Sequence, residues 1–416
     1  MFLDIIAKIF YEGYLLKKVA VIGAGYGGLR AIEHLVGNKE ISLYLFDENP
    51  YHYLQTEAYG YIAGRFDLHD VALDLRNWCY GFKRPVTFVQ EKVLNIDTDK
   101  NQVHTKEQAY DFDYVIVATG ARTNFFSFIS GMDKYGYGVK KLFRSHSFRT
   151  GFEQLLYEKI EGSDKKQNSI NLAIGGAGLS GVEIASEMAD VIQRHAKSIG
   201  ESVKQIKIYL IDASNTILPG MSPYIIEKTV DRLNDLGVQI MTNTFIQSVD
   251  ERTIYFKDGG ELDYTFMIFT GGILANNIDL NTEYKTNKIG QYCCDETLRL
   301  KENIFAIGDC CELKDAKGNL LPPTAQTAEG SAEYVASAIQ KLMTGESLKG
   351  YSGKVDGVFV ALGGRYAVGE VFGVVKVKGY FAYILKKLIT KSYYIGLKLR
   401  LNTGFKKRNT NLTKTK

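Results

Sequence analysis

The sequence predicts an α/β fold with two Rossmann-like domains and a C-terminal amphipathic region. Two observations predict the domains: a G-x-G-x-x-G loop occurs twice, and the strand and helix patterns around each loop follow the same order. A third observation predicts the terminal region, where cationic and apolar residues recur at helical spacing. At 416 residues the chain is long enough for two or three domains with cores of their own.

Each glycine loop lies between a strand pattern and a helix pattern. The first, Gly23-Ala24-Gly25-Tyr26-Gly27-Gly28, follows the apolar run Val19–Ile22, and the second, Gly176-Ala177-Gly178-Leu179-Ser180-Gly181, follows Ile170–Ile174. This spacing lets a strand turn tightly into a helix and brings the helix N-terminus against a pyrophosphate. Two such loops predict a chain that holds two dinucleotides at once.

The first unit continues with alternating patterns. A helix pattern runs through His34, and the apolar run Ile41–Phe46 ends at Asp47. A strand–turn–strand pattern covers Val93–Val103, and Phe112–Gly120 closes the unit. This alternation indicates a parallel sheet with helices on its faces.

The second unit repeats that order, and a last segment returns to the first. A helix pattern covers Val182–His195, the strand Ile206–Ile211 ends at Asp212, a strand–turn–strand pattern spans Phe245–Phe256, and Leu262–Gly271 closes the unit. The returning segment is a short strand, Asn303–Asp309, that ends in an acid, then Pro322-Pro323 and a helix pattern over Ala325–Met343.

The acids after the second strands indicate which dinucleotides bind. An acid at this position accepts hydrogen bonds from a ribose. Asp47 lies 19 residues beyond Gly28, and Asp212 lies 31 beyond Gly181, which a longer helix accommodates. No Arg or Lys follows Asp212 in Ala213-Ser214-Asn215 to receive a 2′-phosphate, which favours NADH over NADPH. A surface strand end remains the alternative reading of each acid.

Composition excludes several other classes. The five cysteines are odd in number and none are spaced C-x-x-C, which argues against a disulfide framework, a zinc site or a thioredoxin-like pair. The six histidines lack metal-ligand spacing, so no metal site is predicted. No run of 18 apolar residues predicts a membrane-spanning helix, and Met1–Phe10 lacks the features of a signal peptide.

The C-terminal segment is a basic appendage on an acidic body. From Val371 to Lys416 there are 12 of the 51 Lys and Arg and no Asp or Glu, so the rest of the chain has 39 basic and 47 acidic residues. Such a tail favours an anionic partner. The final Lys406-Lys407-Arg408 would add attraction to anionic lipid.

Helical spacing within this tail predicts an amphipathic helix over Tyr380–Arg400 that lies in a membrane interface. Nucleic acid is not expected as a partner, because the cations are interleaved with a long apolar face. A helix that packs on the body or pairs across a homodimer is the alternative. The apolar side holds Phe381, Leu385, Leu388, Ser392, Ile395 and Leu399, the cationic side Lys387, Lys391 and Lys398, and Tyr380, Tyr383, Tyr393 and Tyr394 would lie at the headgroups.

These motifs together resemble the flavoprotein disulfide reductase superfamily, whose members bind FAD in the first unit and NAD(P)H in the second. The resemblance rests on the two loops, Ala118-Thr119-Gly120, Gly181-Val182-Glu183 and Ile307-Gly308-Asp309. Within that superfamily the chain is most similar to the type II NADH dehydrogenases, the single-subunit NADH:quinone oxidoreductases. The stretches that carry this likeness are Asn49–Tyr53, Pro322–Ala328, Val368-Gly369 and Gly379–Tyr383.

The resemblance implies a peripheral enzyme on the cytoplasmic face of the cell membrane. It would transfer hydride from NADH to FAD and then electrons to a membrane quinone, without pumping protons. The implied domains are an FAD-binding domain in two parts, 16–125 and 286–345, an NADH-binding domain, 126–285, and a C-terminal membrane-associating region, 346–416.

The resemblance also implies the site residues. Glu183 would be the catalytic residue near the nicotinamide and flavin, as a proton relay or an electrostatic guard; a helix first-turn acid favoured by the helix dipole is the alternative. FAD would be held by Gly23, Ala24, Gly25, Gly27, Gly28, Asp47, Glu48, Val93, Ala118, Thr119, Gly120, Gly308, Asp309, Ala325 and Gln326. NADH would be held by Gly176, Gly178, Gly181, Glu183, Asp212 and Gly271.

The chain departs from the family pattern at two places. Gly330 and Ser331, after Glu329, replace a Gln pair that the family links to the quinone pocket, and Leu54–Glu57 lacks a proline that many members have.

The cysteines keep a second hypothesis open. The vicinal pairs Cys293-Cys294 and Cys310-Cys311 suggest a sulfide:quinone oxidoreductase or another thiol-using flavoenzyme. The alternative is that both pairs lie on buried, strand-like segments, where Cys serves only as a small apolar residue. A third hypothesis is a flavoprotein for redox signalling or scaffolding, which would bind NADH with negligible turnover.

Overall fold

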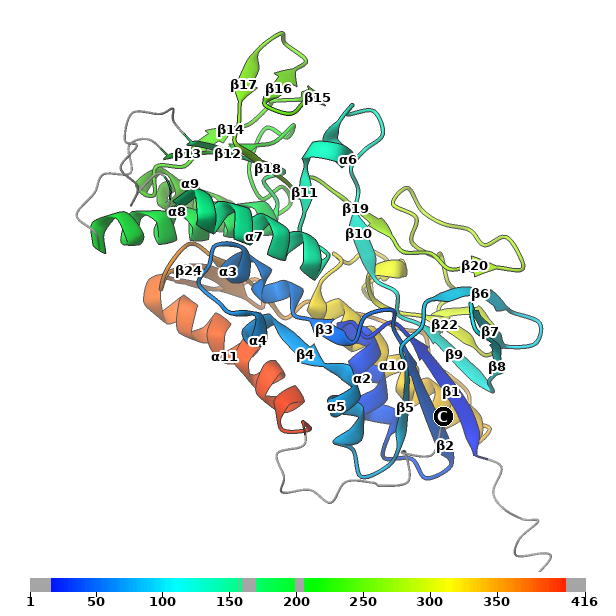
Figure 1. Ribbon diagram of the computed structural model, residues 1–416. Helices are drawn as coiled ribbons and strands as arrows, with labels where there is room; N and C mark the ends of the chain where they lie inside the picture. The colour runs from blue at the N-terminus through cyan, green and yellow to red at the C-terminus, as the bar shows by residue number, and fades with distance from the viewer. Residues whose placement is uncertain (1–15, 157, 159–169, 199–205, 402–416) are drawn as a thin grey trace, which may run out of the picture.

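Two largely parallel sheets organise the molecule (Figure 1), and the computed structural model describes residues 16–156, 158, 170–198 and 206–401. The first sheet has the order β21 (Arg299–Lys301), β22 (Ile304–Ala306), β9 (Tyr114–Val117), β1 (Lys17–Ile22), β2 (Ile41–Phe46), β5 (Val86–Val89). The second has the order β11 (Tyr137–Gly138), β18 (Phe266–Phe269), β12 (Ile170–Gly175), β13 (Ile206–Ile211), β14 (Gln239–Met241). The expected α/β fold is confirmed.

The duplication expected from the sequence is present in the strand order. The run β9-β1-β2-β5 of the first sheet corresponds to β18-β12-β13-β14 of the second, and all these pairings are parallel. Each strand–turn–strand pattern forms an antiparallel pair that a third strand extends. The first set is β6 (Val93–Asp97), β7 (Gln102–Thr105) and β8 (Ala109–Asp111), and β20 (Asp279–Leu280) adds to it in parallel with β6. The second set is β15 (Ile246–Val249), β16 (Thr253–Phe256) and β17 (Glu261–Asp263).

Helices cover one face of the second sheet, and the antiparallel strands β15 and β16 pack against the other through Val249, Ile254 and Phe256. The first sheet likewise packs with Val93, Ile96 and Val103 of β6 and β7. Each glycine loop runs into a helix at the expected place. The helices are α2 (Tyr26–Leu35), α3 (Ala58–Ile62), α4 (Leu68–Val71), α5 (Leu75–Tyr80), α6 (Met132–Tyr135), α7 (Leu142–Leu156), α8 (Leu179–Ser198), α9 (Pro223–Asp235), α10 (Ala325–Met343) and α11 (Gly379–Lys398), with 3₁₀ turns η1 (Gln55–Glu57) and η3 (Gly308–Cys310).

The two units are joined by a ribbon and by a shared core. The ribbon pairs β10 (Ala121–Thr123) with β19 (Ile273–Ala275), where the chain leaves the first unit and returns to it. In the core, Tyr59 and Ile62 of α3 pack with Ile184 and Met188 of α8. Strands β3 (Tyr51–Tyr53) and β4 (Ala72–Asp74) flank α3 in sequence and pair with each other in antiparallel fashion.

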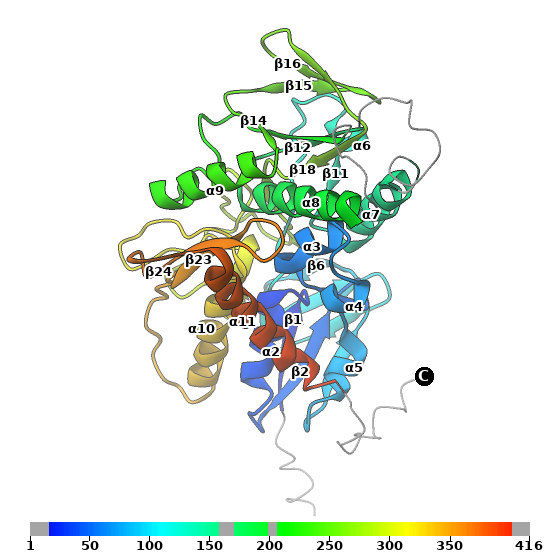
Figure 2. The same ribbon diagram turned by 90° about the vertical axis from the view of Figure 1, so that its left-hand side faces the viewer.

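The C-terminal segment forms a small sheet and a long helix. The strands β23 (Gly357–Ala361), β24 (Ala367–Val371) and β25 (Val375–Lys378) are antiparallel, and their buried residues Val360, Leu362 and Val368 join the core of the second unit. Helix α11 then runs along the side of the molecule past both units (Figures 1 and 2). Over the described ranges, none of the helices has the length and apolar content needed to cross a membrane.

Candidate functional site

The three glycines of the first G-x-G-x-x-G motif, Gly23, Gly25 and Gly28, have three different roles. Gly23 has φ +105°, and a Cβ there would lie 2.4 Å from the carbonyl oxygen of Ala118. A Cβ on Gly28 would lie 1.8 Å from the carbonyl oxygen of Gly23, so the helix starts tightly against the turn. A Cβ on Gly25 would meet nothing within 4 Å. That open space at a helix N-terminus is where a pyrophosphate can approach the backbone.

The second loop repeats this geometry. Gly176 has φ +104°, and a Cβ there would lie 2.5 Å from the amide nitrogen of Gly271. A Cβ on Gly181 would lie 1.8 Å from the carbonyl oxygen of Gly176, and one on Gly178 would meet nothing within 4 Å. Both loops therefore have the geometry of a dinucleotide site.

The acid at the end of β2 is tied to the first loop. One carboxylate oxygen of Asp47 accepts from the backbone N–H of Ala24 at 2.8 Å, and the other accepts from that of Asn49 at 2.8 Å. Burial raises the pKa of Asp47, while these hydrogen bonds oppose the rise. The carboxylate is thus fixed beside the loop, where a ribose hydroxyl is expected.

Asp212 is held in the same way at the end of β13. Its carboxylate accepts from the N–H of Ala177 at 2.6 Å and from that of Ser214 at 2.7 Å. The two acids, which lie at different sequence distances from their loops, occupy equivalent places.

A cavity of about 740 Å³ extends from the first loop along the carboxyl ends of the first sheet. Its walls bring together most of the residues that the sequence assigned to FAD: Gly23, Ala24, Gly25, Gly27, Asp47, Glu48, Val93, Ala118, Thr119, Gly120, Gly308, Asp309 and Ala325. Gly28 lies beneath the turn, and the Gln326 side chain instead accepts from the N–H of Asp356 at 2.8 Å. The walls fit an extended dinucleotide such as FAD.

Other wall residues were not expected from the sequence. Lys140, which follows β11, places its ammonium 3.2 Å from the carboxylate of Asp309. His52 is buried, its Nδ1 lies 2.8 Å from the carbonyl oxygen of Ala24, and burial lowers its pKa to about 4, so the ring is neutral at pH 7. No loop motif marks either residue, because folding brings them to the first loop from other segments.

Glu183 lies outside the walls of this cavity. Its carboxylate is 2.6 Å from the ammonium of Lys386 on α11 and accepts from the N–H of Ala361 at 2.9 Å. Only 11% of the Lys386 side chain and 12% of the Glu183 side chain are exposed. The acid is therefore coupled to the C-terminal helix. The alternative of a first-turn acid is wrong, because Glu183 is the fifth residue of α8 and the first turn holds no acid.

A second ion pair lies beside the first. Lys387 is 2.6 Å from the carboxylate of Glu57 and lies over the ring of Phe66 at 4.1 Å. Burial lowers the pKa of Lys387 against the opposing effect of Glu57. Burial and Glu57 raise the pKa of Tyr59 well above its usual range. Lys387, which helical spacing groups with Lys391 and Lys398 on the cationic side, thus points at the buried Glu57, whereas the other two lysines are exposed.

Two tyrosines of the tail also face the protein instead of a headgroup layer. The Tyr393 hydroxyl is 3.2 Å from Nε2 of His52, and its ring lies 4.9 Å from that of Tyr26. The Tyr394 hydroxyl donates to the backbone oxygen of His69. Both tyrosines are held by aromatic and polar partners on the first unit, which the helical spacing alone did not reveal.

The predicted apolar side of α11 faces outward. Phe381, Leu388, Ile395 and Leu399 are 61, 60, 52 and 67% exposed. The hairpin between β24 and β25 adds Phe372 and Val374, which are 71 and 75% exposed. Single exposed apolar residues are ordinary, but a continuous row along a helix is typical of a surface that contacts another phase or molecule. The Lys406–Arg408 cluster and Met1–Phe10 lie outside the described residues.

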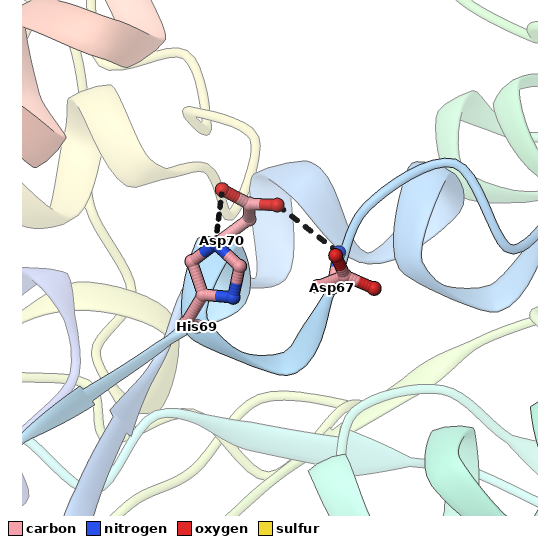
Figure 3. A group of neighbouring side chains, drawn as sticks. All are labelled: Asp67, His69 and Asp70. Atoms are coloured by element: carbon pink, nitrogen blue, oxygen red, sulfur yellow. Dashed lines mark hydrogen bonds and ion pairs between the residues drawn. The ribbon is translucent and has the colours of Figure 1, made fainter.

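One group of side chains has the arrangement of a metal site, at the start of α4 (Figure 3). Nε2 of His69 is 3.7 Å from the carboxylate of Asp70, and Asp70 accepts from the backbone N–H of Asp67 at 3.0 Å. Asp67 and Asp70 form a capping box for α4, which accounts for their positions.

The chain is similar to proteins of a known family over most of its length. Residues 17–332 match the model of the pyridine nucleotide-disulphide oxidoreductase family. The chain is 30% identical over 382 residues to a type II NADH:quinone oxidoreductase of Staphylococcus aureus (strain NCTC 8325 / PS 47), which covers 90% of this chain and 94% of that protein.

Solved structures share the fold. NDH2 from Plasmodium falciparum, in complex with NADH, has a TM-score of 0.79 at 20% identity, over 94% of this chain and 99% of that one. The sulfide:quinone oxidoreductase from Aquifex aeolicus has a TM-score of 0.76 at 15% identity, over 94% and 93%.

Proposed function

The chain belongs to the pyridine nucleotide-disulphide oxidoreductase family and, within it, to the type II NADH:quinone oxidoreductases, and we propose that it oxidises NADH through a bound FAD and reduces a membrane quinone without pumping protons. The observation that carries this proposal is the long cavity between the first loop and Ala325, whose described wall residues include no cysteine. Electrons that leave the flavin therefore pass to a diffusible acceptor and not to a thiol pair in the wall.

We assign one set of residues to FAD and another to NADH. Asp47 and the first loop hold the ADP half of FAD, Asp309 holds its ribityl chain, and Ala325 borders the ring. The second loop and Asp212 hold NADH, as the open face of Gly178 allows. FAD supplies the hydride acceptor, and the protein supplies orientation and electrostatics.

Glu183 is the proposed catalytic residue, acting on protons or on charge. Its ion pair with Lys386 gives it a link to the C-terminal helix. This pair lies next to the Lys387–Glu57 pair, and together they put two carboxylates and two ammoniums in a largely buried place. The cluster therefore brings acid and ammonium groups together between α8 and α11, where a proton relay for quinol formation can be built.

The membrane attachment is proposed from α11. Its outward row of apolar side chains, with exposed Lys391 and Lys398 nearby, matches a helix that lies in the interface of an anionic bilayer. The quinone would enter from the lipid, and the attachment would be on the cytoplasmic face. An apolar row of this kind also fits a homodimer contact.

The second candidate function is sulfide:quinone oxidoreduction, which the fold similarity and the cysteines favour. A flavoprotein for signalling or scaffolding is the third. The cavity walls without cysteine count against the second.

The experiment that tests the proposal is anaerobic mixing of the full chain with NADH, then with a short-chain quinone, while flavin absorbance is followed. NADH should bleach the flavin and quinone should restore it, while sulfide should not bleach it. The same result is expected for Cys310→Ser/Cys311→Ser. A flavin that NADH leaves unchanged overturns the proposal, and bleaching by sulfide that needs these cysteines supports the second candidate.

A further inference from the structure

Four of the five cysteines come together behind the proposed flavin site. The pair Cys293-Cys294 lies on a segment that runs beside the segment carrying Cys310-Cys311. The two segments are paired in parallel at Tyr292 and Cys311. The N–H of Tyr292 donates to the carbonyl of Cys310 at 2.9 Å, and the N–H of Glu312 donates back to the carbonyl of Tyr292 at 3.0 Å. Backbone pairing thus fixes the register of the two vicinal pairs.

Within this cluster one pair of sulfurs meets. Sγ of Cys294 and Sγ of Cys311 are 3.5 Å apart. The neighbouring thiols point elsewhere: Cys293 lies 3.9 Å from the carboxylate of Glu312, and Cys310 donates to the carbonyl of Ile307 at 3.2 Å. The two thiols of each vicinal pair therefore have different partners.

The two sulfurs that meet differ in access to solvent. Cys294 is half-buried, whereas Cys311 is 1% exposed. The hydrogen bond that the Cys311 thiol donates to Cys294, together with burial, raises the pKa of Cys311 well above its usual range. A solvent oxidant therefore reaches Cys294 first, and Cys311 is placed to react with the oxidised sulfur.

We propose that Cys294 and Cys311 form a reversible disulfide when the protein meets a peroxide. The thiolate of Cys294 attacks a peroxide oxygen and breaks the O–O bond, which gives a sulfenic acid and a hydroxide; the hydroxide takes up the proton that the thiol lost and becomes water. The sulfur of Cys311 then attacks the Cys294 sulfur and displaces its hydroxyl. The hydroxyl takes up the Cys311 proton and leaves as a second water. Two electrons pass from the sulfurs to the peroxide, and a small thiol reverses the bond by exchange.

The geometry needs little movement for this step. Rotations of the two side chains must bring the sulfurs from 3.5 Å to about 2.05 Å, while the paired backbones stay in register. The vicinal alternatives would require Cys293 or Cys310 to leave its contact with Glu312 or Ile307.

The disulfide would act on the segment that carries Asp309. Gln291 donates from its side chain to the carbonyl of Asp309 at 3.1 Å, so the Cys294 segment already braces that residue. A covalent link one residue beyond Cys310 would restrict the segment further. This consequence, unlike the disulfide itself, rests on the proposed role of Asp309 in binding FAD. We expect oxidation to slow the release of FAD several-fold.

The test is to treat the full-length protein with hydrogen peroxide, block free thiols with an alkylating agent, digest, and map peptides by mass spectrometry. A peptide linking Cys294 to Cys311 should form and should disappear on treatment with dithiothreitol. Cys294→Ser and Cys311→Ser should abolish it, and Cys293→Ser and Cys79→Ser should not. Cys294 is half-buried, so its variant tests the pair even if Cys311→Ser fails to fold.

Several outcomes would overturn the proposal. These are five free thiols after peroxide, a link between other cysteines, or a Cys294 sulfinic acid without any link. The FAD consequence is measured separately, as flavin fluorescence released in chaotropic salt from oxidised and reduced protein. Equal release rates in the presence of the mapped disulfide would overturn the coupling to Asp309. None of these readouts depends on NADH or quinone turnover.

Discussion

At the scale of one residue, Gly25 and Gly28 of the first loop differ in what a side chain there would meet. Gly25→Ala should leave the fold intact, because its Cβ meets nothing within 4 Å, but it should fill the space of the pyrophosphate. We expect a roughly tenfold or greater loss of FAD affinity, a change of at least about 1.4 kcal/mol. FAD content per purified chain, measured by absorbance after denaturation, checks this.

Gly28→Ala is the matched control for that substitution. Its Cβ would lie 1.8 Å from a backbone oxygen, so it should lower the unfolding temperature by several degrees or prevent folding. Full FAD content in Gly25→Ala, or an unchanged unfolding temperature in Gly28→Ala, would contradict the assignment of the loop.

A second single-residue prediction concerns Glu329, beside the altered Gly330 and Ser331. Burial, with Glu333 and Glu33 nearby, raises its pKa to about 7 despite Arg30. A carboxyl whose pKa is raised by folding stabilises the protein below the unfolded value, and that stability is lost as pH rises from about 4.5 to about 7. Above pH 7, Glu329→Gln should therefore be more stable than the parent chain by about 1–3 kcal/mol.

Chemical denaturation at pH 5 and pH 8 measures this difference. The gap between Glu329→Gln and the parent should be larger at pH 8. Glu346→Gln, at an exposed position just beyond the same helix, should show no such dependence. A gap that is equal at the two pH values would show that the Glu329 carboxyl titrates as an ordinary exposed group.

At the scale of elements, the helices and strands predicted best are those with strong periodicity. The bounds of β2, β13 and α10 follow from the sequence, because each is a short apolar run or an amphipathic stretch between clear breakers. The sheet β23–β25 and the inward face of α11 were not predicted. Lys386 meets Glu183 from 203 residues away, and local patterns carry no information about such a partner.

The outward row of α11 yields a prediction for membrane binding. Leu388→Asp should reduce binding of the protein to anionic lipid vesicles by about tenfold or more, because it places a charge in the apolar face. Phe128→Asp is the control, since Phe128 is 74% exposed but belongs to the segment between β10 and α6, where it stacks on Phe126. Vesicle sedimentation measures both. Binding that survives Leu388→Asp would contradict the interfacial role of the helix.

Substitution is a sharper test of this helix than its removal. Truncation before α11 would strip the buried Ala382 and Leu397 from the body and leave Glu183 and Glu57 without their lysines. A buried charge that loses its partner destabilises a protein by about 3–5 kcal/mol. Loss of membrane binding on truncation could then reflect unfolding, whereas Leu388→Asp changes an exposed position.

At the scale of the whole molecule, the two Rossmann-like units are coupled by buried contacts. Arg65, which follows α3 of the first unit, pairs with Glu187 and, at 2.5 Å, with Asp190, both on α8 of the second. Glu187 and Asp190 are 2 and 7% exposed. The sequence indicates two units, but the ion pairs and the shared core between them arise from long-range packing that no motif marks.

This coupling predicts that the two Rossmann-like units unfold in one cooperative transition. Arg65→Met should lower its midpoint by several degrees, because the buried Glu187 would lose the cation it pairs with, at a cost of about 3–5 kcal/mol, whereas Asp190 keeps Arg194 at 2.7 Å. The midpoint of Arg65→Lys should lie between those of the parent chain and Arg65→Met, because lysine keeps the charge but lacks the planar guanidinium. Differential scanning calorimetry measures the midpoints. Two separate transitions in the parent chain, with Arg65→Met shifting neither, would show that the units unfold independently and that the interface contributes little.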